Sequence, residues 1–376
     1  MQLTDVIYFD MGRVCLFFND LAIYRRAIYK MIDREYDCDW YIEDVDTGIK
    51  EFDAKELKRV KRLPVCNMGP FYRVKGFAKL LKKEYSIYFV LGSTRNLSLF
   101  AFCLLKKLFY PRKRVYFWTH GFYGKESWAE LFFWKRPLFK LPDGLFPYSD
   151  YCKALMVKQG FNPEKIFPIH NSLDYDNQLL LRKSIMPTGF YIEHFGNSDP
   201  VLIIIGRLNL RKRLDLLFEA VDLLRNRGEL YNIVLVGDGE DKNKLQQMAS
   251  EKQLIERTWF YGPCYDERQN ATLLVNSDMC VVPGDIGLTA IHALMFGVPA
   301  ITHNCFKYQG PEFEAIKPGF TGDFYEYGSV ESLANVISNW FNTHNNREKV
   351  RTDCYDEIDS NWNPYYQLNV IREHLK

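Results

Sequence analysis

The second half of this chain alternates short apolar runs with amphipathic stretches. The apolar runs are VLIIIG (201–206), NIVLVG (232–237), WFYG (259–262), MCVVPG (279–284) and PAIT (299–302). After the first run, apolar residues recur with the i, i+3, i+4, i+7 spacing of an amphipathic helix, at Leu214, Leu217, Phe218, Val221 and Leu224. Gly228 is expected to end this helix. Strands that alternate with helices predict a parallel, doubly wound α/β sheet.

The first half repeats this pattern less regularly. Strands are predicted at VIYFD (6–10), YSIYFVLG (85–92), RVYFWTHG (114–121) and LFPYS (145–149). Helices are predicted over about 70–84 and 96–109, whereas residues 30–66 are charged and irregular and receive no assignment. The first half is therefore expected to form a second Rossmann-like domain.

A segment rich in Gly, Pro, Asn and Ser, MPTGFYIEHFGNSDP (186–200), joins the two halves. This composition is typical of a domain boundary. It predicts one domain over 1–188 and another over 189–376, with a last helix at about 362–376. Doubly wound domains bind ligands at the carboxyl ends of their strands. Two such domains facing each other would hold their substrates in the cleft between them.

The composition narrows the class of protein. A hydrophobic content of 47% in 376 residues suffices for packed cores. The nine cysteines are scattered and form no CxxC pair, which indicates reduced thiols. Neither a signal peptide nor an apolar run long enough to span a membrane is evident. A cytoplasmic location is expected.

The charge is unevenly distributed along the chain. Residues 1–190 hold 31 Lys and Arg against 21 Asp and Glu, a balance of +10, and the remainder holds 18 against 26, a balance of −8. A basic first half suits an anionic acceptor or an anionic phospholipid surface, in particular through KELKRVKRL (55–63) and KKLFYPRKR (106–114). The alternative is a solvated surface of uneven charge. No nucleic-acid partner is expected, because the cations are spread thinly and no binding motif occurs.

The segment GRLNLRKRLDLLFEA (206–220) carries the most specific chemistry. Arg207 and Lys212 follow a buried strand that ends at Gly206, and they precede the amphipathic helix. Arginine can hold phosphate oxygens bidentately, and lysine adds a compact charge. Cations are unfavourable near a helix N-terminus unless an anion lies there too. The pattern therefore indicates a diphosphate site, with a merely basic surface as the alternative.

This segment resembles the GR-L-x-x-x-K signature of glycosyltransferase family 4. Similar segments follow in the family's order over about residues 145–345, namely YSDYCKALMVKQGFNPEKIFPIHNSLD (148–174), LVGDG (235–239), FYG (260–262), VVPGDIGLTAIHALMFGVPAIT (281–302) and PEFEAIKPGFTGDFY (311–325). The resemblance implies a GT-B fold, that is, two facing Rossmann-like domains with a C-terminal helix that returns to the first. It also implies a UDP- or GDP-sugar donor, a glycan or lipid-diphosphate-linked acceptor, retention of configuration, and no metal.

The sequence departs from the family at two positions. Family members carry two glutamates eight positions apart, of which the first contacts the donor sugar and the second the nucleotide ribose; Gly284 and His292 stand there instead. His292 can bind a ribose hydroxyl as a neutral imidazole, or it can be a core residue without a ligand role. Asp285 can replace the first carboxylate. The donor is also expected to meet the turn and helix start at Gly287, Leu288 and Thr289.

Two acids further along the chain are also expected near the donor. Glu314 falls where the family keeps a glutamate, and Glu312 is a second substitute for the carboxylate missing at 284. The alternative for both is a solvated loop acid.

In the first half, the resemblance points to the end of one strand. His120 corresponds to a family histidine that contacts the transferred sugar, and Gly121 follows it. Family members usually have a glycine pair after the first strand, facing the acceptor, and only Gly12 is found there in this chain.

The resemblance implies a retaining hexosyltransferase that builds a surface polysaccharide at the cytoplasmic face of a membrane. Two alternatives remain open. One is a catalytically inactive homologue that binds sugar nucleotides, which would explain the lost glutamates. The other is a GT-B-type enzyme of different chemistry, an epimerase or a phosphorylase.

Overall fold

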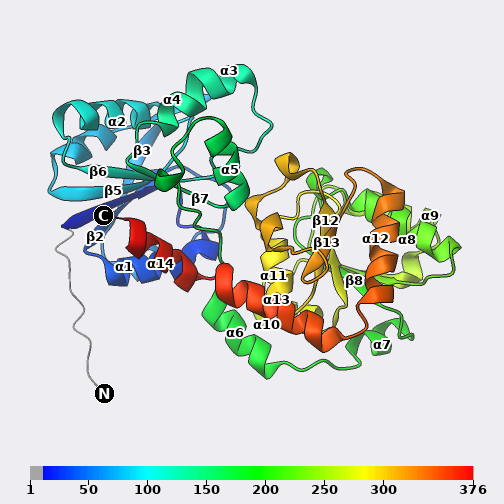
Figure 1. Ribbon diagram of the computed structural model, residues 1–376. Helices are drawn as coiled ribbons and strands as arrows, with labels where there is room; N and C mark the ends of the chain where they lie inside the picture. The colour runs from blue at the N-terminus through cyan, green and yellow to red at the C-terminus, as the bar shows by residue number, and fades with distance from the viewer. Residues whose placement is uncertain (1–11, 376) are drawn as a thin grey trace. The chain divides into compact units, whose positions relative to one another are not determined.

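The computed structural model describes residues 12–375, which form two compact units (Figure 1). The first unit holds the chain up to Ser172 together with the segment that starts at Pro364, and the second unit holds Leu173–Asn363. Each unit is built on a parallel sheet with helices on both faces, as the pattern of apolar runs predicts.

The first unit contains the strands β1 (Arg13–Phe18), β2 (Cys38–Asp44), β3 (Val60–Met68), β4 (Phe71–Val74), β5 (Tyr85–Leu91), β6 (Arg114–Thr119) and β7 (Gly144–Pro147). Its helices are α1 (Arg26–Glu35), α2 (Leu97–Phe109), α3 (Trp128–Glu130), α4 (Arg136–Phe139), α5 (Asp150–Lys158) and α14 (Pro364–His374). The strand order is β4-β3-β2-β1-β5-β6-β7, and β4 alone is antiparallel to its neighbour within the described residues.

The two faces of this sheet bury alternate residues of each strand, as the period of a strand requires. Val14, Leu16 and Phe18 of β1 join the core that α1 and α14 cover. Cys15 and Phe17 join the core beneath α2, α4 and α5. The C-terminal helix therefore belongs to the first unit, where Arg372 pairs with Glu35 of α1.

The second unit contains β8 (Val201–Ile205), β9 (Asn232–Val236), β10 (Thr258–Gly262), β11 (Met279–Val281), β12 (Ala300–His303) and β13 (Gly322–Tyr325), in the order β10-β9-β8-β11-β12-β13. Its helices are α6 (Tyr175–Ser184), α7 (Phe190–Phe195), α8 (Leu214–Asn226), α9 (Lys242–Glu251), α10 (Glu267–Asn276), α11 (Thr289–Met295), α12 (Val330–Thr343) and α13 (Arg347–Asn361). Every pairing in this sheet is parallel.

The units divide after Ser172, earlier than the expected boundary at 188/189. The reason is that α6 and α7 pack on the second unit. Gln178 Nε2 in α6 donates to Glu267 Oε1 at 2.7 Å, and the Tyr191 hydroxyl in α7 donates to Leu273 O at 3.0 Å.

Several predictions for the first half need correction. The helix expected over 70–84 is strand β4 followed by a 3-10 helix at Phe77–Lys82, because Gly69 and Pro70 form a two-residue turn that pairs β4 with β3. The unassigned stretch 30–66 holds most of α1 and β3 and all of β2. The strand expected at 6–10 lies outside the described residues.

Candidate functional site

The loop after β8 is held tightly against the loop after β9. Gly206 N donates to Val236 O at 2.9 Å. A Cβ at Gly237 would lie 1.8 Å from Gly206 O, and one at Gly239 would lie 2.1 Å from Leu208 O. Only glycine permits this approach, which gives the GDG of LVGDG a structural reason.

Lys212 lies at the end of this loop and reaches across to the loop after β11. Its Nζ donates to Asp285 O at 2.8 Å and to Ile286 O at 2.9 Å. Burial lowers the pKa of this ammonium group, and the negative charges of Asp285 and Glu312 offset part of that effect. An ammonium has three N–H donors, so within the described residues one donor remains for a ligand.

Arg207 lies nearer the end of β8, and its side chain is exposed. Across residues 12–375, no ion pair or side-chain hydrogen bond holds its guanidinium group. A cation without an internal partner, beside a second and partly desolvated cation, suits an anionic ligand with more than one charged oxygen.

The helix start expected at 287–289 meets the same loop. Gly287 has a φ of 52°, Leu288 is the N-cap of α11, and Thr289 Oγ1 donates to Ile205 O at 3.0 Å. A Cβ at Gly206 would lie 3.6 Å from Thr289 Oγ1 and 4.0 Å from Lys212 Cε. The end of β8 and the start of α11 are thus neighbours, as their order along parallel strands predicts.

Gly284 leaves no room for the glutamate that the resembled family carries. A Cβ at this position would lie 1.9 Å from Arg211 O and 2.7 Å from Lys212 C. The reason is a backbone clamp in which Gly284 N donates to Lys212 O at 2.7 Å and Asp285 N donates to Arg211 O at 2.9 Å. The missing carboxylate is therefore a steric consequence of how two loops meet.

Asp285 fastens these loops. Its Oδ2 accepts from Arg211 Nη2 at 2.6 Å, and its Oδ1 accepts from Gly310 N at 2.8 Å. With both oxygens engaged, Asp285 is a poor replacement for the carboxylate missing at Gly284.

Of Glu312 and Glu314, Glu312 is the better placed to replace the carboxylate that is missing at Gly284. It lies on the 3-10 helix Pro311–Ala315 and is only 4% exposed. A Cβ at Gly310 would lie 2.8 Å from Glu312 Oε2 and 3.3 Å from Gly287 Cα, and the charge of Glu312 acts on Lys212. The structure thus brings Glu312 to the cation and the α11 loop. Glu314 is half-buried on the same 3-10 helix, and its backbone oxygen accepts from Lys317.

His292 is held by an acid that the sequence analysis did not identify. Its Nε2 lies 3.0 Å from Glu267 Oε1 at the start of α10, and its side chain is 14% exposed. Burial alone would raise the pKa of Glu267, but the hydrogen bond and charge of His292 keep that pKa below its usual value. An orienting carboxylate fixes the imidazole ring, so His292 has a defined position one turn after Thr289.

Gln309 is a second contributor that the sequence did not indicate. This buried amide accepts from Ile286 N at 3.0 Å and donates to Thr302 Oγ1 at 2.7 Å, which fixes the loop that Lys212 contacts. In the sequence, Gln309 is marked only by its place in the dipeptide Gln309-Gly310, directly before PEFEAI. Such a dipeptide does not indicate which distant residues the glutamine contacts.

In the first unit, His120 follows β6 and its ring stacks against aromatic neighbours. Its centroid lies 4.7 Å from the Tyr148 ring and 6.0 Å from the Tyr123 ring. Arg25 Nη2 donates to the Tyr148 hydroxyl at 2.5 Å. Desolvation and the positive charges of Arg25 and Lys135 lower the pKa of His120, which favours the neutral imidazole at pH 7.

The two glycines expected near the acceptor have structural roles. Gly121 is buried, and a Cβ there would lie 2.2 Å from Cys152 Sγ, so it lets the loop after β6 pack against α5. Gly12 immediately precedes β1, which starts at Arg13, and it therefore lies at the amino end of that strand; the strand expected before Gly12 is outside the described residues.

Comparisons with known proteins agree with this architecture. A family described as "Glycosyl transferases group 1" matches residues 191–355. The lipopolysaccharide 1,6-galactosyltransferase of Salmonella typhimurium is 25% identical over 208 residues, which cover 51% of this chain and 52% of that protein. The Escherichia coli enzyme of the same name is 22% identical over 214 residues, 54% of each chain. The chain thus spans about half the length of these relatives.

Two solved structures share the fold over nearly the whole chain. Anabaena HepE in complex with UDP has a TM-score of 0.72 at 16% identity, with 96% of this chain and 99% of that chain covered. The lipopolysaccharide outer core galactosyltransferase WaaB has a TM-score of 0.71 at 17% identity, with 96% and 100% covered. These likenesses establish the GT-B fold. Residues 191–355 of this chain, which lie in the second unit, thus match the glycosyl transferases group 1 family.

Proposed function

We propose that this protein transfers a hexose-type sugar, with retention of configuration, from a UDP- or GDP-sugar to a saccharide or lipid-linked acceptor in surface polysaccharide synthesis. The observation that carries the proposal is the pair of cations after β8: exposed Arg207, and Lys212, whose Nζ bridges two carbonyls beside α11. Relatives named as lipopolysaccharide galactosyltransferases and a fold neighbour bound to UDP-glucose support the choice of substrate.

The cations act on the leaving group. As the bond between the anomeric carbon and the diphosphate breaks, negative charge grows on the phosphate oxygens, and Arg207 and Lys212 stabilise that charge more in the transition state than in the ground state. Lys212 needs little reorganisation, because two carbonyls already orient its Nζ. The acceptor hydroxyl attacks from the face that the diphosphate leaves, and a departing phosphate oxygen takes its proton. This route requires neither a side-chain nucleophile nor a metal ion.

The remaining site residues orient the substrates. Glu312 takes the place of the carboxylate that Gly284 excludes and binds sugar hydroxyls. His292, oriented by Glu267, binds a ribose hydroxyl. His120 of the first unit, neutral at pH 7, contacts the transferred sugar. Arg25 and Tyr148 position its ring.

A thermal-shift screen tests the proposal, since a ligand that binds only the folded state raises its stability. We expect UDP- or GDP-sugars to raise the melting temperature both with and without EDTA, and free sugars to leave it unchanged. Incubating the best donor with a lipid-linked or saccharide acceptor should then give a product whose anomeric configuration, read by NMR, matches that of the donor. Release of an altered sugar without acceptor, or dependence on inorganic phosphate, would replace the proposal with an epimerase or a phosphorylase.

One observation favours a second candidate. Since Gly284 sterically excludes the glutamate of the resembled family, the chain could bind a sugar nucleotide without turning it over. This inactive homologue gives the same thermal shift but no product with any acceptor and no slow hydrolysis of the donor.

Replacing His292 by alanine is expected to raise the donor KM about tenfold and to leave kcat nearly unchanged. The loss of a ribose hydrogen bond weakens ground-state and transition-state binding equally. Steady-state kinetics with a varied donor concentration measure the change. The control is Glu267→Gln, which keeps a hydrogen-bonding partner for the ring and should give a smaller rise in KM. An unaltered KM in the alanine variant would make His292 a core residue.

A further inference from the structure

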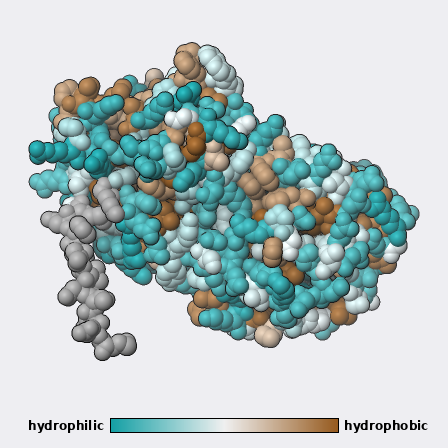
Figure 2. All heavy atoms as spheres, viewed as in Figure 1, coloured by the Kyte–Doolittle hydropathy of each residue, from teal (hydrophilic) through white to brown (hydrophobic). Residues whose placement is uncertain are grey.

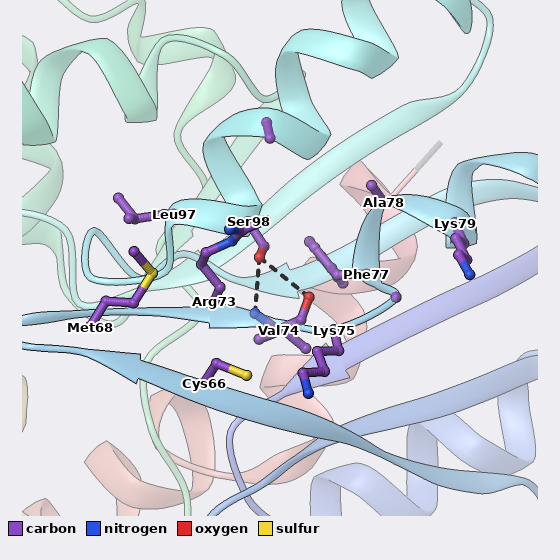
Figure 3. Close-up of a pocket in the computed structure, with 12 residues that line it drawn as sticks. Cys66, Met68, Arg73, Val74, Lys75, Phe77, Ala78, Lys79, Leu97 and Ser98 are labelled. Atoms are coloured by element: carbon purple, nitrogen blue, oxygen red, sulfur yellow. Dashed lines mark hydrogen bonds between the residues drawn. The ribbon is translucent and has the colours of Figure 1, made fainter.

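The first unit has a pocket of about 540 Å³ between β4, the 3-10 helix Phe77–Lys82 and the start of α2 (Figure 3). Its apolar lining consists of Cys66, Met68, Val74, Phe77, Ala78, Leu97 and Ala101. The Ser98 hydroxyl at its floor is already engaged with the backbone of Val74. The pocket thus offers an apolar wall and no free polar group at its base.

Three cations border this pocket, namely Arg73, Lys75 and Lys79 (Figure 3). All three are exposed, and over residues 12–375 none forms an ion pair with an acidic side chain. Some other cations of the unit are neutralised by acidic neighbours, for example Arg59, which pairs with Asp37 and Asp39. Unmatched positive charge beside an apolar wall suits a partner that is both anionic and apolar.

The outer face of α2 continues the apolar wall. Leu104, Leu108 and Phe109 are 50%, 72% and 68% exposed, whereas Lys106 is buried and its Nζ donates to Asp143 Oδ2 at 2.7 Å. A helix on a water-facing surface would bury its leucine and phenylalanine side chains and expose its lysines. The outer face of α2 is therefore suited to a medium other than water.

An aromatic cluster extends the same surface toward α3. Trp128 stacks on Phe132, and Phe133 meets both rings edge-on, with centroids 5.1–6.0 Å apart. The three side chains are 70%, 51% and 57% exposed. Trp134, the next residue after Phe133, packs against Phe71 of β4 with ring centroids 4.8 Å apart. Figure 2 shows hydrophobic residues gathered at the surface over α2 and α3.

We propose that this surface, made of the pocket, its three cations, the outer face of α2 and the aromatic cluster, docks on a bilayer that contains anionic phospholipids. Tryptophan and phenylalanine favour the interfacial region of a bilayer, and lysine and arginine bind its anionic headgroups. The proposed contact is peripheral; none of the helices in the described part of the chain has the length and apolarity of a membrane span. A second copy of this chain fits less well, because a symmetric contact would set the unpaired cations against each other.

The docking surface differs from the basic stretches that the sequence indicated. In 55–63, Arg59 pairs with two aspartates and Arg62 pairs with Glu51. In 106–114, Lys106 and Arg114 pair with Asp143. Four of the ten cations in these two stretches are held in ion pairs, whereas within the described residues none of the three cations at the pocket is.

Flotation with phosphatidylcholine vesicles, with and without phosphatidylglycerol, tests the proposal. We expect the full chain to bind only the anionic vesicles, and more weakly at high salt. Each Lys or Arg near an anionic surface contributes about fivefold, so Arg73→Gln/Lys75→Gln/Lys79→Gln should weaken binding by about a hundredfold at low salt. Trp128→Ser/Phe132→Ser/Phe133→Ser should weaken it at least about tenfold at any salt concentration.

Matched variants control for charge and for exposed aromatic area. Lys55→Gln/Lys158→Gln/Lys244→Gln removes three exposed cations elsewhere, and Tyr265→Ser/Phe320→Ser removes exposed aromatic rings from the second unit. Both should bind vesicles like the parent chain. Equal binding by the parent and the two surface variants overturns the proposal. So does stabilisation by inorganic phosphate without vesicle binding, which would make the pocket a site for free anions.

The inference does not depend on the proposed function, because vesicle binding needs no sugar nucleotide and the thermal shift with donors needs no vesicles. Each surface variant should keep the donor-induced thermal shift of the parent chain, which also shows that it is folded.

Discussion

Replacing Arg207 by alanine is expected to lower kcat/KM by roughly two to three orders of magnitude, the usual effect of removing one preorganised group that stabilises transition-state charge. The side chain is exposed and has no ion pair in the described part of the chain, so its loss should leave the free energy of unfolding unchanged. Donor-dependent product formation and urea unfolding, measured on the same preparation, check both statements.

Arg211→Ala is the matched control for Arg207. Arg211 lies in the same loop and its side chain is 79% exposed, but it pairs with Asp285. We expect it to lose less than about tenfold in kcat/KM, as is usual for an exposed ion pair. Arg207→Lys should recover only part of the rate, since a lysine cannot form the bidentate contact. If Arg207→Ala retains full activity and donor affinity, the diphosphate does not bind at the end of β8.

Replacing Gly284 by alanine is expected to destabilise the second unit by about 3 kcal/mol, the upper end of the usual cost of overpacking. The added Cβ would meet backbone atoms of Arg211 and Lys212, which cannot turn aside as a flexible side chain can. Relief of the clash would break the bonds from Gly284 N and Asp285 N, and would move Lys212. We therefore expect activity to fall together with stability, as read by urea denaturation and donor turnover.

Gly189→Ala is the control for the added methyl group, because nothing lies within 4 Å of a Cβ at that position and its φ is −78°. We expect it to change stability by less than about 0.5 kcal/mol. The informative reverse experiment is Gly284→Glu, which restores the residue of the resembled family. A gain of activity in that variant would show that the two loops can separate, and would return the donor-sugar role from Glu312 to position 284.

The fold class and the cationic end of β8 follow from the amino-acid pattern alone. Buried parallel strands read as continuous apolar runs, and five such runs match β8 to β12 closely. The positions of Arg207, Lys212 and Thr289 relative to strand ends follow from this local pattern, because parallel strands present their carboxyl ends at one edge. In the first half, the apolar run at 14–18 forms β1 and Gly12 lies before it, whereas the run at 6–10 is outside the described residues.

The partners of those residues, in contrast, depend on contacts between segments that are distant in sequence. The contact that forbids a side chain at Gly284 joins it to Arg211, and the acid that holds His292 lies on another helix, at Glu267. Likewise, Lys106 can be buried because Asp143, distant in sequence, neutralises its charge. Periodicity reports which face of an element is apolar, but packing between distant segments decides whether that face is covered, and which polar groups find partners.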